Sequence, residues 1–134
     1  MTDAQKELLN LSKVQLLWSL DQLNKTWKRV NQLIKGLQIP VSAVVVIDCG
    51  DDEGTQRHLA WFKHQGEWQV CLTEWNEFSE RGNVTPILSA TAEERLQNLD
   101  RVPKLYQALV DETKLFANNA REKCDALNDR LDKI

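Results

Sequence analysis

The stretch RHLAWFKHQGEWQVCLTEW, residues 57–75, decides how the rest of the chain is arranged. Two runs rich in aromatic and β-branched residues flank Gln65-Gly66, a pattern that predicts a β-hairpin with a two-residue turn. With that turn, Trp61 lies opposite Val70 on an apolar face, and the other face is mixed, as a half-buried antiparallel sheet requires. A slip of one residue would set Trp61 against a glutamine and scramble both faces. The pattern therefore favours a single register.

Length and composition are those of one folded domain, residues 1–134, with 42% hydrophobic and 28% charged residues and a formal net charge of −3. Residues 41–90 hold three Lys/Arg and eight Asp/Glu. A nucleic-acid binder usually concentrates positive charge on its recognition surface, and here the sheet region is acidic. The N-terminus lacks the pattern of a signal peptide, and no run approaches the roughly 18 apolar residues of a membrane span. We expect neither nucleic acid nor a membrane as a partner.

A long helix is predicted for residues 3–37, with a coiled-coil-like seam along it. Thr2 or Asp3 can cap its start, and Gly36 followed by Pro40 supplies the stop signal. Basic residues in its second half are interpreted as a solvated face. The seam repeats every seven residues at Leu9, Leu16, Leu23, Val30 and Leu37, with Leu20, Trp27 and Ile34 in the second stripe. The basic residues outside it are Lys25, Lys28, Arg29 and Lys35.

After this helix, residues 41–48 form an almost continuous apolar and β-branched run, which predicts a strand covered on both faces. The polar turn 49–54 leads into the hairpin, so three antiparallel strands follow one another as a meander. Residues 84–88 are a candidate for a short fourth strand at the edge, a question that the sequence leaves open.

A second helical region is predicted from Thr91, which with Glu94 matches a capping box. Pro103 predicts a kink or break near residues 101–102, followed by a helix to about Asp132. Both long helices exceed the length of the strands. We predict an α+β fold in which both helices pack on one sheet face and their overhangs pair as a helical stalk.

Candidate catalytic and metal-ligating groups are sparse. The acidic turn residues Asp48, Asp51, Asp52 and Glu53 lack the ligand spacing of an EF-hand and are interpreted as a solvated turn. His58 and His64 lie on one predicted face but roughly 20 Å apart, too far to share a metal ion. Cys71 falls in mid-strand and is interpreted as a small packed residue. We predict no catalytic residue, no metal and no cofactor.

Two apolar features are the candidate interaction surfaces. Trp75 and Phe78, in an acidic segment, are either an exposed partner-binding hot spot or tucked beneath the loop. Along the first half of the long helix, the apolar surface wraps well over half the circumference, more than one packed neighbour covers. A homodimer is therefore predicted, with its interface at Leu8, Leu9, Leu11, Val14, Leu17 and Trp18.

The favoured function is a non-catalytic protein–protein interaction module, a small dimeric adaptor or regulator. In size, acidity and the order helix–strands–helix, the chain resembles type III secretion chaperones, whose first helix is much shorter. That resemblance implies the alternative, a peptide- or protein-binding chaperone. A small metal-dependent enzyme is the third alternative. The three scattered cysteines, Cys49, Cys71 and Cys124, indicate reduced thiols and a cytoplasmic location.

Overall fold

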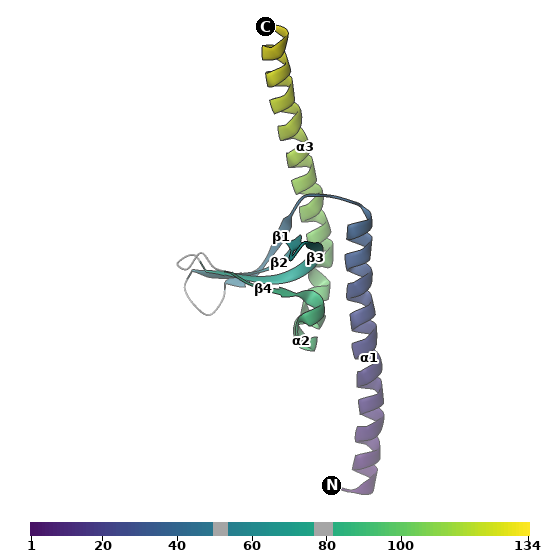
Figure 1. The fold of residues 1–134 in the computed structure, drawn as a ribbon. Coiled ribbons are helices and arrows are strands. Elements are labelled where there is room, and N and C mark those ends of the chain that lie inside the picture. Colours follow the sequence, from purple (N-terminus) through teal and green to yellow (C-terminus); the bar gives the residue numbers. More distant parts are fainter. Residues whose placement is uncertain (50–53, 77–81) are drawn as a thin grey trace.

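The computed structural model describes residues 1–49, 54–76 and 82–134. Its fold is α+β, with one antiparallel sheet in the order β1-β2-β3-β4 and two long helices (Figure 1). The chain order is α1 (Asp3–Gly36), β1 (Ala43–Cys49), β2 (Thr55–His64), β3 (Glu67–Asn76), β4 (Gly82–Pro86), the 3₁₀ turn η1 (Ile87–Ser89), α2 (Ala92–Asn98), the 3₁₀ turn η2 (Leu99–Arg101) and α3 (Val102–Asp132).

The β2–β3 hairpin has the register that the sequence predicts, with Trp61 opposite Val70. Gln65 and Gly66 both have positive φ, 51° and 83°. That combination matches the right-handed twist of the flanking strands, and the glycine adopts it at no steric cost. The register of the central hairpin is therefore confirmed.

The prediction of a three-stranded meander is wrong, because Gly82–Pro86 adds a fourth strand, β4, beside β3. Two residues of the open candidate 84–88 fall beyond it, in the 3₁₀ turn η1. A Cβ on Gly82 would lie 2.9 Å from the carbonyl oxygen of Glu74, so glycine permits the close approach of the two strands here. The acidic turn residues Asp51, Asp52 and Glu53 lie outside the described residues.

The core lies between one face of the sheet and the two long helices, as predicted. Trp61 and Trp68 stack on this face, with ring centroids 6.2 Å apart. α1 and α3 contribute to the same buried cluster as the strands. The largest side chains with almost no exposed surface are Trp27, Ile34, Leu59, Trp61, Val70, Cys71, Ile87 and Leu105.

Hydrogen bonds of Trp27 and Asn31 join α1 to the rest of the core. The indole Nε1 of Trp27 donates to the backbone oxygen of Arg95 in α2, at 2.9 Å. The side-chain oxygen of Asn31 accepts from the backbone nitrogen of Val70, at 2.8 Å. β4 pairs with β3 only as far as Cys71, so Asn31 satisfies the next amide of β3 where no strand reaches it.

The helix ends follow the sequence signals closely. Thr2 caps α1 and forms a capping box with Gln5. Thr91 and Glu94 form the predicted capping box of α2. The chain then passes through η2 and starts α3 at Val102, with Pro103 in its first turn, where a missing backbone N–H costs nothing.

The predicted stalk is wrong. α1 and α3 run in the same direction but are staggered, so that the start of α1 and the end of α3 project from opposite ends of the molecule (Figure 1). We call residues 3–19 the α1 overhang and residues 114–132 the α3 overhang; every residue in both is exposed. The sheet together with the rest of the helices is the head. At the rise of about 1.5 Å per residue, the overhangs are about 26 Å and about 29 Å long.

Candidate functional site

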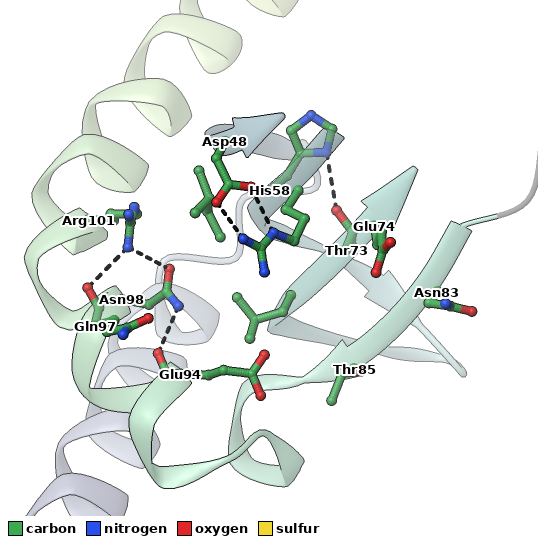
Figure 2. Close-up of a pocket in the computed structure, with 13 residues that line it drawn as sticks. Asp48, His58, Thr73, Glu74, Asn83, Thr85, Glu94, Gln97, Asn98 and Arg101 are labelled. Carbon is green, nitrogen blue, oxygen red and sulfur yellow. Dashed lines mark hydrogen bonds and ion pairs between the residues drawn. The ribbon is translucent and has the colours of Figure 1, made fainter. Parts of the chain in front are cut away.

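A polar cleft with a volume of about 210 Å³ lies between the sheet and the corner formed by α2 and α3 (Figure 2). Asp48 accepts two hydrogen bonds from the guanidinium of Arg57, one of them 2.7 Å from Nε to Oδ1. This pairing holds the pKa of the Asp48 carboxyl below its usual value. Arg101 donates to the backbone oxygen of Gln97, at 3.1 Å, and to Oδ1 of Asn98, at 3.2 Å.

Asp48 and Arg57 thus form an ion pair in this cleft, whereas Arg101 is hydrogen-bonded to uncharged groups. Asn98, which is buried, also donates from Nδ2 to the backbone oxygen of Glu94, at 2.7 Å. These hydrogen bonds hold the corner between α2 and α3 together. The sequence did not predict the cleft, because its side chains come from segments more than fifty residues apart.

The predicted acidic cluster is only partly described. Asp48 of β1 lies directly opposite Arg57 of β2, and the two form a cross-strand ion pair. Within the described ranges, no group of three His, Cys, Asp or Glu side chains is placed to hold a metal ion.

His58 and His64 are separate, as predicted for two residues far apart on one strand. The Nδ1 of His58 lies 3.4 Å from the hydroxyl of Thr73, and Nε2 lies 3.1 Å from the side-chain oxygen of Gln56. Burial lowers the pKa of His58. The two groups that its ring nitrogens contact, on Thr73 and Gln56, are neutral, and neither makes His58 a stronger base.

Cys71 is fully buried opposite Ala60, which agrees with its interpretation as a packed residue. Burial raises the pKa of its thiol to about 11. A thiol with that pKa is almost entirely protonated at neutral pH and is a poor nucleophile.

The two aromatic candidates for a partner-binding hot spot differ in what can be described. Trp75 is 44% exposed near the end of β3, opposite Gln56. Phe78 lies outside the described residues, so the exposed hot spot, one of the two alternatives that the sequence leaves open, stays a prediction.

The largest apolar surface is the α1 overhang. Its predicted interface residues are between 56% and 66% exposed, at Leu8, Leu9, Leu11, Val14, Leu17 and Trp18. An α-helix has about 3.6 residues per turn, so these side chains point in several directions around the helix axis and do not form a single stripe. Leu9 continues, with Leu16, the side of α1 that is buried in the head, whereas Leu11, Val14 and Trp18 lie on the opposite side.

A second apolar surface is the stripe along the α3 overhang. It continues the side of α3 that is buried in the head, and its small residues lie between larger ones. The stripe consists of Phe116, Ala117, Ala120, Cys124, Leu127 and Leu131. The exposure of Phe116, Leu127 and Leu131 exceeds half of each side chain.

An apolar groove lies at the base of each overhang. Beside the α3 overhang, Leu33 of α1 and Leu37, which follows α1, face Tyr106 and Val110 of α3 across a groove of about 530 Å³. At the base of the α1 overhang, a groove of about 460 Å³ is lined by residues of α1, α2 and η2, among them Leu16, Leu20, Leu96 and Leu99. At its base, each overhang therefore borders an apolar groove on the head.

No protein-family model, no curated protein and no solved structure matches this chain. Within the described ranges, no helix is both long enough and apolar enough to cross a membrane. The function proposed below therefore depends on the chemistry of the described surfaces alone.

Proposed function

We propose that this protein is a non-catalytic protein–protein interaction module, a small dimeric adaptor or regulator. The observation that supports this proposal is the α1 overhang, in which seven large apolar side chains on several sides of one helix are each more than half exposed. An isolated helix of this length is marginal in water, and proteins rarely leave so much contiguous apolar surface uncovered. A second protein surface would stabilise the helix and cover its apolar side chains.

The proposal includes a homodimer and a cytoplasmic location. Cys71 and Cys124 are free thiols, which is typical of reducing compartments. Two-fold symmetric dimers are the commonest oligomers, and in such a dimer the second copy can cover the exposed apolar surface of the first.

Light scattering at micromolar concentration tests the proposal. The wild type should have the mass of a dimer, and Leu17→Glu should have the mass of a monomer, because a charge would enter the apolar interface. Gln32→Glu is the matched control: it places the same charge on an exposed position of α1 within the head and should leave the dimer intact. A monomeric wild type would contradict the proposal.

A peptide-binding chaperone is the second candidate. The observation in its favour is β1, an edge strand on which Val44 and Val46 are each 56% exposed on the face opposite the helices. An extended peptide can add to such an edge, using backbone hydrogen bonds for affinity. A narrow range of partners in a pull-down would count against this candidate.

A further inference from the structure

Resting on the proposed dimer, we infer that two copies pair antiparallel through the outer side of α1, the side that faces away from the head. At about 100° per residue, Leu11, Val14 and Trp18 lie within about 60° of one another on this side. Each of them is more than half exposed. Figure 1 shows the sheet, α2 and α3 on the other side of α1, and no described element covers the outer side. A second α1 can therefore lie along it without meeting the head.

The outer side of α1 carries opposite charges in its two halves. Its acidic residues, Asp3 and Glu7, lie at the start of the helix, and both are exposed. Its second half is basic and equally exposed, at Lys25, Lys28 and Arg29. Within the described part of the chain, Glu7, Lys28 and Arg29 form no ion pair. Antiparallel pairing sets the acidic start of one chain against the basic half of the other, which is the charge complementarity expected of an interface.

The spacing along the outer side is self-complementary. Six positions follow one another in steps of four, three, four, three and four residues: Glu7, Leu11, Val14, Trp18, Asp21 and Lys25. This series of steps is the same in both directions, and a two-fold interface must be complementary to itself in this way. A two-fold axis perpendicular to α1, level with position 16, therefore brings each layer of one helix opposite a layer of the other.

The apolar residues form the centre of the interface in this register. Trp18 lies opposite Val14 of the second copy, so that a large side chain packs against a smaller one. Leu11 follows in the next layer, one turn from Trp18 of the second copy. Leu8 and Leu17 flank this sector at about 90° to either side and lie at the edges of the interface.

Ion pairs close both ends of the interface. Glu7 lies opposite Lys25 of the second copy, a lysine that also pairs with Asp21 of its own chain at 2.8 Å. Asp3 lies opposite Arg29 of the second copy. The two-fold axis repeats each of these contacts on the other side of the apolar centre. Exposed ion pairs are individually weak, so their main effect here is to select the orientation and the register of the two helices.

Other pairings of the outer side are less favourable. A parallel pair would set each basic half against the same residues of the second copy, and each acidic start likewise. An antiparallel pair shifted by one heptad would set Trp18 opposite Glu7 or opposite Asp21, according to the direction of the shift. The register centred on position 16 instead sets apolar residues against apolar ones at its centre and acids against bases at its ends.

The antiparallel arrangement also keeps the two heads apart. Each head lies on the inner side of its own α1, at the end of the helix that carries Trp27. The two heads therefore lie at opposite ends and on opposite sides of the helix pair. The helices overlap over residues 3–29, a length of about 40 Å. Leu9 and Leu16, on the inner side, face away from the second copy.

Leu11→Glu and Leu9→Glu distinguish the outer side from the inner side. The two leucines are 60% and 59% exposed within one chain, so the same charge is placed in matched surroundings. In light scattering at micromolar concentration, Leu11→Glu should have the mass of a monomer, because a charge enters the apolar centre beside Asp21 of the second copy. Leu9→Glu should keep the mass of a dimer. A monomeric Leu9→Glu would overturn the pairing through the outer side.

Charge reversal tests the register. Glu7→Lys and Lys25→Glu should each raise the dissociation constant of the dimer about tenfold, because two symmetry-related ion pairs become contacts between like charges. The double variant Glu7→Lys/Lys25→Glu restores both pairs with the charges exchanged. Its dissociation constant should return to within about threefold of the wild-type value, because the two positions are coupled. Analytical ultracentrifugation measures all three, and a double variant as weak as the single ones would overturn the register.

The wild type separates this inference from the proposed function. A wild-type dimer that tolerates Leu11→Glu would overturn the pairing through the outer side and leave the proposed dimer standing. A monomeric wild type would overturn both.

Discussion

The head and the overhangs are built from the same two helices, yet they obey different rules. In the head, Trp27 is completely buried and its indole nitrogen is hydrogen-bonded. On the α1 overhang, two and a half turns earlier, Trp18 is 64% exposed. One helix thus carries apolar side chains for two purposes, and the sequence pattern alone does not distinguish the part that stabilises the monomer from the part available to a partner.

The two tryptophans give the largest expected difference. Trp27→Ala should lower the free energy of unfolding by about 3–5 kcal/mol, because it opens a cavity and removes a hydrogen bond to α2. Trp18→Ala should change it by about 0.5 kcal/mol or less at protein concentrations low enough to keep the chain monomeric. Urea unfolding followed by circular dichroism measures both. Similar losses in the two variants would break the distinction between head and overhang.

Two asparagines of α1, one in the head and one on the overhang, give the same comparison for a polar side chain. Asn31→Ala should lower the free energy of unfolding by about 1–3 kcal/mol, because the amide of the buried Val70 loses its acceptor. Asn10→Ala, on the overhang, should be nearly neutral. If Asn31→Ala were as mild as Asn10→Ala, a rearranged strand or a water molecule must satisfy the amide.

The smallest effect concerns His58 in the head. Its pKa is lowered by burial from the ordinary value of 6.5, so below about pH 6.5 the unfolded chain binds a proton more readily than the folded one. Stability should therefore fall as the pH falls from 7 to 5.5, and His58→Gln should reduce that fall. Arg57 lowers the pKa of Asp48 from 3.8, so the stability that the ionised Asp48 carboxylate contributes is lost only at more acidic pH. An unchanged slope in His58→Gln would assign the pH dependence to another group.

The features that the sequence predicted correctly are local ones. The turn at Gln65-Gly66 fixes the hairpin register within a few residues, and Thr91 with Glu94 fixes the start of α2. Burial of Trp61 also follows locally, because the hairpin register assigns it to the apolar face. Each of these signals depends on a few residues that are close together in the sequence, so the sequence alone is enough to predict it.

The direction of the overhangs could not be predicted in the same way. In an antiparallel meander each additional strand reverses the chain, so a fourth strand returns it to the end of the sheet where β1 begins. Gly82–Pro86 is short, and its strand pairing depends on β3 rather than on a pattern of its own. Missing that strand misplaced the start of α3, and therefore the side toward which its overhang projects.

The hydrogen bond between Trp27 and Arg95 has a consequence for biosynthesis, because 68 positions separate the two residues. At roughly 5–20 residues per second, α1 leaves the ribosome about 3–14 s before the segment that holds it. During that interval both apolar sides of the helix are uncovered, on nascent chains that polysomes keep close together. Chains that emerge side by side can then assemble before either one is complete.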